Sequence, residues 1–215
     1  MNPVVVAHGL WLPGWETIVL RRRLQGAGFT PRLFRYQTVG RGLKANAALL
    51  ADFIADIPGD TLDLVGYSLG GVVALQMLND HGMERAGRVV CMGSPLNGSR
   101  TGEALASLPG GRRALGRSMG DLAERSGIGH WTGQRELGVI AGNLPVGLGR
   151  LLGAVASPND GIVAVHETKI EGATDHCVLH VSHTSMLFDR TAADQAAHFL
   201  RNGRFNRHER TREPE

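Results

Sequence analysis

One serine of this chain stands in a pattern that can turn a hydroxyl into a nucleophile. Ser68 is the centre of GYSLG (66–70), which follows the apolar run TLDLV and precedes the helical run VVALQML. A serine attacks a carbonyl when a base accepts its proton and a sharp strand-to-helix turn exposes its oxygen, and small residues on both sides allow that turn. We therefore predict that Ser68 is a catalytic nucleophile. The alternative is a helix-capping serine, which would not need glycine on both sides.

The same five-residue pattern occurs a second time, as GRSMG (116–120), and shows how little the pattern means by itself. No strand is expected before it. The apolar residues Leu115, Met119 and Leu122 recur at helical spacing and run through the match. Ser118 is therefore expected inside a basic helix, where nothing would activate its hydroxyl.

Nine histidines compete for the role of the base, and His183 is the best placed. It follows the apolar run CVLHV (177–181), for which we predict a strand, and precedes a predicted helix over 185–201. Side chains at the carboxyl ends of parallel strands face the crevice in which such folds bind ligands. The other histidines are expected to be structural or solvated, with His176 at the start of this strand and His180 inside it.

An acid is needed to orient the histidine and to stabilise its charged form. Asp160 stands in the turn SPNDGIV, after the predicted strand ELGVIAG, and completes the chain order Ser68, Asp160, His183. An ordinary Asx turn before glycine is the alternative interpretation. Asp175 is the rival carboxylate, but it lies near the start of the last predicted strand and hence at the opposite edge.

Backbone N–H groups can stabilise the negative charge that develops on a carbonyl oxygen during acyl transfer. We predict two such donors. One is the amide of Leu69, directly after the nucleophile, and the other is the amide of Leu10, in the loop HGLW (8–11) after the first predicted strand. Gly9 is expected to permit the unusual turn that this loop requires.

Three further side chains near these donors receive a predicted role. His8 is expected to sit behind the turn and to be structural rather than catalytic. Trp11 and Tyr67 are assigned to the substrate pocket, although ordinary packing is the alternative for Trp11.

Short β-rich runs alternate with longer helical stretches, which predicts an α/β fold with a mostly parallel sheet and helices on both faces. The segment 98–135 breaks this alternation and is expected to be an insertion, either a lid over the site or an ornament that packs on the core. Residues 1–202 are expected to form a single domain and residues 203–215 a charged tail. The six expected strands cover 3–7, 32–35, 62–65, 88–92, 137–141 and 177–181, and the expected helices cover 14–27, 44–56, 69–81 and 185–201.

Composition limits the remaining classes. The net charge of +3 comes largely from the tail, and no nucleic-acid-binding motif accompanies it, so no nucleic-acid partner is expected. Cys91 and Cys177 lie in apolar runs without metal-ligand spacing, so we expect buried thiols and no metal. The start MNPVVVAHG lacks a secretory signal, and no apolar run approaches the roughly 20 residues that span a bilayer. We therefore expect a cytoplasmic protein.

Taken together, HGLW, GYSLG, MGSPLNGS, PNDGIV and VSHTSML resemble the bacterial lipase and esterase branch of the α/β-hydrolase family. The resemblance covers nearly the whole chain except 98–135. It implies a minimal, six-stranded member without the first two strands of that fold, with no cofactor, which hydrolyses small-molecule or lipid carboxylic esters through an acyl-enzyme. A thioesterase or acyltransferase with the same three residues remains an alternative, as does a non-catalytic binding protein.

Overall fold

The structure, a computed structural model, describes residues 2–124, 127–133, 135–147 and 155–207. Six strands form one sheet, in which every neighbouring pair is parallel and the order is β2-β1-β3-β4-β5-β6. This confirms the predicted α/β architecture. The strands are β1 (Pro3–Ala7), β2 (Thr30–Phe34), β3 (Asp63–Tyr67), β4 (Val89–Met92), β5 (Leu137–Gly142) and β6 (Asp175–Leu179).

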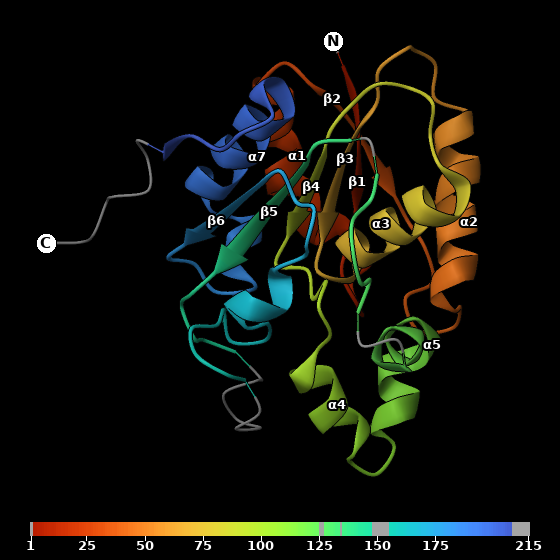
Figure 1. Cartoon of the computed structure of the whole chain (residues 1–215), viewed down its shortest axis with the longest axis vertical. Coiled ribbons are helices and arrows are strands. Elements are labelled where there is room, and N and C mark those ends of the chain that lie inside the picture. Colours follow the sequence, from red (N-terminus) through yellow and green to blue (C-terminus); the bar gives the residue numbers. More distant parts are fainter. Residues whose placement is uncertain (1, 125–126, 134, 148–154, 208–215) are drawn as a thin grey trace, which may run out of the picture.

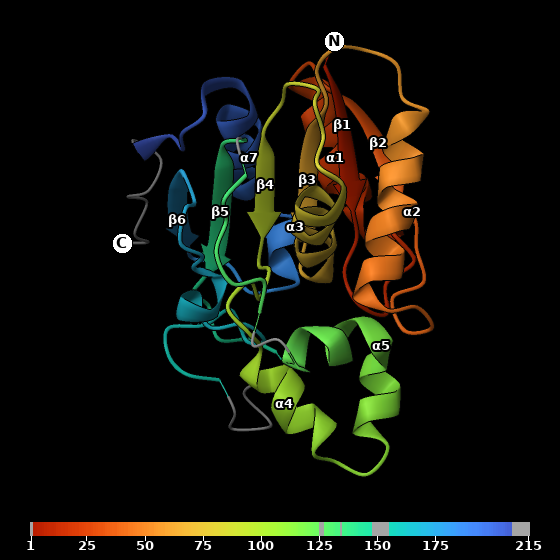
Figure 2. The same ribbon diagram turned by 45° about the vertical axis from the view of Figure 1, so that its right-hand side comes forward.

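Helices cover both faces of the sheet (Figures 1 and 2). On one face α1 (Ile18–Gly26) and α7 (Arg190–Asn202) pack together, and on the other α2 (Leu43–Ala55) and α3 (Leu69–His81) do so. Because successive strand residues point to opposite faces, each central strand contributes to two apolar cores. The remaining short elements are the 3-10 turns η1 (Trp15–Thr17), η2 (Val165–Thr168) and η3 (Ser185–Leu187).

Among the predicted strands, the largest error concerns the last one. It was expected over 177–181 but runs from Asp175 to Leu179, because Asp175 pairs with Gly138 of β5 and the chain turns where the N–H of Val181 bonds to the carbonyl of Leu179. The expected helix over 185–201 is divided into η3 and α7, whose N-terminus is capped by the side chain of Asp189. His183 therefore lies in a loop of its own after the strand.

The edge strand β2 also begins earlier than expected, at Thr30 instead of residue 32. Pro31 lies within it and lacks a backbone N–H, which an edge strand tolerates because only one of its sides is paired. The predicted helix over 14–27 begins as η1, and α1 proper starts at Ile18. None of these shifts moves a predicted site residue to another edge of the sheet.

The segment 98–135 contributes α4 (Arg100–Ala106) and α5 (Gly111–Glu124), and no strand among its described residues. Both helices lie beyond the carboxyl ends of the strands (Figure 2). The predicted apolar stripe of α5 is buried, but the helix is not continuous through GRSMG: Gly116 has φ 74° and a Cβ there would lie 2.4 Å from Cα of Val39. Most of the charged tail, residues 208–215, lies outside the described residues. No helix in the described part of the chain is long and apolar enough to cross a membrane.

Candidate active site

Ser68 occupies a strained turn between β3 and α3. Its backbone has φ 53° and ψ −122°, a conformation that costs a non-glycine residue about 1–3 kcal/mol. The flanking glycines are needed because the turn is tight: a Cβ at Gly66 would lie 2.3 Å from Cα of Gly71, and one at Gly70 would lie 2.2 Å from the carbonyl oxygen of Ala7. The strand, the turn and the helix are thus packed so closely that the serine side chain is directed outward from the sheet edge.

A histidine and a carboxylate lie in line with this serine. His183 Nε2 is 3.1 Å from Ser68 Oγ, and His183 Nδ1 is 2.7 Å from Asp160 Oδ2. Because a carboxylate only accepts hydrogen bonds, Nδ1 carries the proton of the neutral ring and Nε2 is free to accept one from the serine. The three residues that were predicted from separate loops are therefore brought together at the carboxyl edge of the sheet.

Backbone groups hold the carboxylate in place. Asp160 Oδ1 accepts hydrogen bonds from the N–H groups of Ile162 (3.0 Å) and Val163 (2.7 Å), and the side chain is fully buried. The N–H of His183 bonds in turn to the carbonyl of Asp160. The rival Asp175 starts β6 at the opposite edge, where it accepts a hydrogen bond from the N–H of Phe205.

The two residues predicted to supply N–H donors are Leu69, which follows Ser68 directly, and Leu10. Leu69 is the first residue of α3, so its N–H has no partner within the helix. Leu10 lines the same cavity as Ser68. The reason given above for Gly9 is wrong: the left-handed residue of the loop is Trp11, with φ 61°. Gly9 is instead a point of close approach: a Cβ there would lie 3.1 Å from the Tyr67 ring and 3.2 Å from Cβ of Ser68, so these side chains would have to shift slightly.

His8 supports the loop HGLW through hydrogen bonds. It is buried, its Nδ1 lies 3.0 Å from the carbonyl oxygen of Gly9, and its Nε2 accepts a hydrogen bond from the N–H of Tyr36. The hydroxyl of Tyr36 donates to the carbonyl of His8, and the two rings stack. Burial lowers the pKa of His8. The ring is thus a neutral structural bridge, as its position in the sequence indicated.

A cavity of about 600 Å³ opens beside Ser68 and His183. Trp11 forms part of its wall and, although half exposed, donates a hydrogen bond from its indole N–H to the carbonyl of Ala114 in α5. Tyr67 also lines the cavity, and its hydroxyl donates to the carbonyl of His183 over 2.9 Å. Most of the remaining wall is apolar and comes from Leu10, Leu12, Pro95, Leu105, Leu115, Met119, Ile162 and Val163.

The three residues follow one another along the chain in the order Ser68, Asp160, His183, which is typical of one known family. The model of the alpha/beta hydrolase family matches residues 4–197. The chain belongs to the α/β-hydrolase family. No curated protein matches its sequence. Among solved structures, the mature lipase of Bacillus licheniformis is similar to this hydrolase with a TM-score of 0.73 at 18% identity, covering 94% of this chain and 91% of that one.

Two further solved structures share the fold of this hydrolase. A metagenomic carboxyl esterase has a TM-score of 0.68 at 20% identity, covering 86% of this chain and 65% of the esterase. A thioesterase of prodiginine biosynthesis from Streptomyces coelicolor has a TM-score of 0.60 at 14% identity, covering 94% of this chain and 85% of that one. At these identities the likeness establishes the α/β-hydrolase fold of this chain.

Two residues of this hydrolase that shape the site were not predicted. Gly93, after β4, has φ 57°, and a Cβ there would lie 3.1 Å from Nδ1 of His183 and 3.3 Å from Oδ2 of Asp160. Glu167 is buried, and its carboxylate accepts hydrogen bonds from the N–H groups of Ala164 and Arg100. It thereby links the start of α4 to the loop that carries Asp160. The glycine in MGSPLNGS was a visible signal for the first, whereas nothing in the sequence marked Glu167.

The second serine in a GxSxG pattern has a structural part in this hydrolase. Ser118 is fully buried in α5, where its hydroxyl donates to the carbonyl of Arg41 and accepts from the side-chain amide of Asn46, each over 2.9 Å. Its hydroxyl therefore joins α5 to the start of α2. Across the described residues, no three His, Cys, Asp or Glu side chains are grouped so that they could hold a metal ion.

Proposed function

We propose that this α/β-hydrolase cleaves carboxylic esters through an acyl-enzyme formed on Ser68. The observation that carries the proposal is the continuous hydrogen-bond chain from Asp160 through His183 to Ser68, with contacts of 2.7 and 3.1 Å, at the wall of an apolar cavity. Such a chain supplies what a serine needs for nucleophilic attack, namely a base and a group that orients the base. The proposed catalytic unit is residues 1–202.

The first half of the reaction acylates the serine. Ser68 Oγ attacks the ester carbonyl carbon while His183 Nε2 accepts the hydroxyl proton, and the carboxylate of Asp160 stabilises the imidazolium that results. The N–H groups of Leu10 and Leu69 stabilise the negative charge on the carbonyl oxygen. The bond between the carbonyl carbon and the alkoxy oxygen then breaks, and His183 transfers its proton to the departing alcohol.

The second half regenerates the enzyme. His183 takes a proton from a water molecule, and the resulting hydroxide attacks the acyl carbon of the Ser68 ester. The same two N–H groups stabilise the second oxyanion. When the intermediate collapses, the carboxylic acid leaves and the serine recovers its proton from His183. The wall of the cavity favours a small-molecule ester with an apolar acyl group.

The chain offers a matched pair of variants for the test, because two of its serines lie in GxSxG patterns. With 4-nitrophenyl butyrate as substrate, Ser68→Ala should lower kcat by about 10⁶-fold. Ser118→Ala should retain the wild-type value, because this serine lies in α5 and touches neither Ser68 nor His183. A fluorophosphonate should label the wild type and Ser118→Ala, but not Ser68→Ala. Unchanged turnover in folded Ser68→Ala would refute the proposal.

A substrate comparison separates the ester hydrolase from its rivals. Esters and thioesters with the same acyl group are offered with water alone or with an added alcohol as acceptor. The proposed function requires the free acid as the main product and a higher kcat/KM for the ester. A thioester preference would make the protein a thioesterase, and acyl transfer to the alcohol would make it an acyltransferase. Absence of both turnover and labelling of Ser68 would leave a binding protein.

A further inference from the structure

A second cavity lies behind the wall of the first. It has a volume of about 710 Å³ and lies between α4 and α5, away from Ser68 and His183. Four residues line both cavities: Ser99, Gly102, Leu115 and Met119. These residues therefore form the partition that separates the cavity beside the nucleophile from the one between the two helices.

Met119 is the centre of this partition. Its side chain projects from α5 toward α4, and a Cβ placed on Gly102 of α4 would lie 3.3 Å from its terminal methyl carbon. The glycine thus leaves just enough room for the methionine to reach the neighbouring helix. Leu115 precedes the kink at Gly116 and lines the same two cavities, and both side chains are buried. Methionine is unbranched and flexible, so it closes a gap without a rigid fit.

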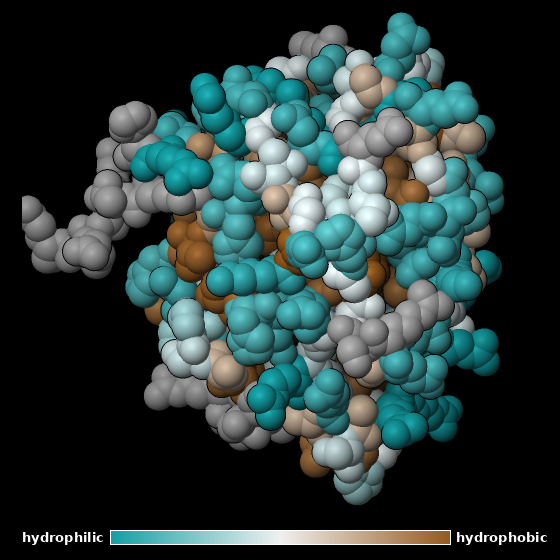
Figure 3. All heavy atoms as spheres, in the orientation of Figure 1, coloured by the Kyte–Doolittle hydropathy of each residue, from teal (hydrophilic) through white to brown (hydrophobic). Residues whose placement is uncertain are grey.

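The two cavities differ in chemical character. The wall of the first is mainly aliphatic, whereas the second is bordered by Glu103, Arg112, Arg117 and Asp121 as well as by apolar side chains. On the outer surface in Figure 3, apolar and polar residues likewise lie side by side at the lower end, where α4 and α5 lie. An alkyl chain attached to Ser68 would be covered by apolar atoms as far as the partition. Beyond it the chain would have apolar partners such as Leu122 and Ala106, with charged side chains at the border of the cavity.

We propose that Met119 sets the longest acyl chain that the site accepts. This inference rests on the proposed ester hydrolysis and assigns it a substrate class, esters of medium-length straight-chain acids, whose terminal methyl group lies against Met119 and Gly102. Removing the methionine side chain joins the two cavities, and longer acyl chains then enter the space between α4 and α5. Leu115, on the other side of the kink at Gly116, completes the partition.

The kinetic test compares 4-nitrophenyl esters from butyrate to palmitate. Met119→Ala should raise the ratio of kcat/KM for the dodecanoate to that for the butyrate by at least about tenfold, since a few methylene groups in an apolar pocket are worth this much or more. Met77→Ala is the matched control: Met77 is also buried, in α3, but lines neither cavity, so its ratio should remain that of the wild type. An unchanged ratio in folded Met119→Ala would overturn the proposal.

A binding measurement separates failure of this inference from failure of the proposed function. Calorimetry with free fatty acids of graded length compares Ser68→Ala with the double variant Ser68→Ala/Met119→Ala. The double variant should prefer chains longer by several methylene groups, whether or not the wild type hydrolyses any ester. Identical length profiles would refute the role of Met119. If circular dichroism shows that Met119→Ala does not fold, Met119→Val, which removes less volume, is judged by the same two criteria.

Discussion

A carboxylate is buried at each end of the strands, and the two differ in their hydrogen-bond partners. The C-terminal ends of the strands form the carboxyl edge of the sheet, and the N-terminal ends form the amino edge. At the carboxyl edge, Asp160 accepts two backbone N–H bonds and the bond from His183, so that both of its oxygens are satisfied. At the amino edge, Asp63 accepts the N–H of Arg88 on one oxygen, and its other oxygen has no hydrogen-bond partner among the described residues. Burial raises the pKa of Asp63, although the guanidinium groups of Arg88 and Arg135 oppose this.

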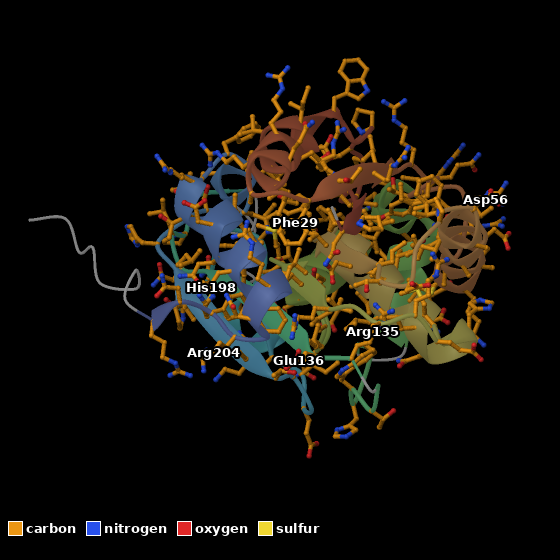
Figure 4. All side chains as sticks on the ribbon, turned by 90° about the horizontal axis from the view of Figure 1, so that it is seen from above. Phe29, Asp56, Arg135, Glu136, His198 and Arg204 are labelled. Atoms are coloured by element: carbon orange, nitrogen blue, oxygen red, sulfur yellow. The ribbon has the colours of Figure 1, made fainter. Side chains whose placement is uncertain are left out.

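The side chains around Asp63 explain why that edge is structural. Arg135 donates hydrogen bonds to the carbonyls of Leu62 and Arg85, and burial lowers its pKa to about 10. Glu136, next to it, forms an ion pair with Arg88; Figure 4 looks onto this edge and labels Arg135 and Glu136. Arginine side chains at this edge thus donate hydrogen bonds to backbone carbonyls near the starts of the strands. At the carboxyl edge, backbone N–H groups instead hold the Asp160 carboxylate in a fixed position. Catalysis requires charges that are preorganised in this way.

The contrast between the two carboxylates is tested most sharply by the same substitution at each. Asp160→Asn should lower kcat by about 10⁴-fold, because the amide no longer stabilises the imidazolium and can hold His183 in the wrong tautomer. Asp63→Asn should leave kcat within about twofold, since Asp63 lies at the other end of the strand from Ser68. Both are measured with the same short-chain ester after circular dichroism has shown folded protein. A large loss of kcat in Asp63→Asn would break the distinction.

A smaller effect is expected from a single hydrogen bond at the carboxyl edge. Tyr67→Phe removes the donor to the carbonyl of His183 and should lower kcat by about tenfold, which corresponds to the usual value of one buried hydrogen bond. KM should change little, because the ring that lines the cavity is retained. Steady-state kinetics and thermal unfolding measured together check this positioning role. A loss of stability with unchanged kcat would mean that the hydroxyl is structural, like the groups of the amino edge.

The site residues that the sequence predicted differ from those it missed in whether a local pattern indicates their role. The three proposed catalytic residues, Ser68, His183 and Asp160, each follow from a local signal, because a strand end and a turn can be recognised in a short stretch of sequence. The roles of the residues that position these three side chains cannot be recognised in this way. Gly93 approaches the histidine from another strand, and Glu167 joins α4 to the acid loop across 67 residues of chain.

The predicted limits of strands and helices were wrong where a tertiary contact decides them. The last strand starts at Asp175 because β5 offers a partner there, although the apolar run begins two residues later. The helix through GRSMG is interrupted at Gly116, where the backbone must leave room for Val39. In both cases local propensity predicted an element, and packing against a distant segment fixed its limits.

The smallest expected effect concerns the pH dependence of stability at the amino edge. The raised pKa means that folded protein holds the Asp63 proton more tightly than the unfolded chain, whose reference pKa is 3.8. As the pH rises from 3.8 through the folded pKa, folded molecules therefore bind more protons than unfolded ones, and this residue lowers the free energy of unfolding until it is fully ionised. Asp63→Asn cannot ionise at this position and does not lose stability in this way. As the pH is raised, the free energy of unfolding of the variant should therefore increase relative to that of the wild type. Urea denaturation at a series of pH values measures it. A difference that stayed constant with pH would show that the Arg88 and Arg135 charges offset the burial of Asp63, and the two edges would then differ in geometry alone.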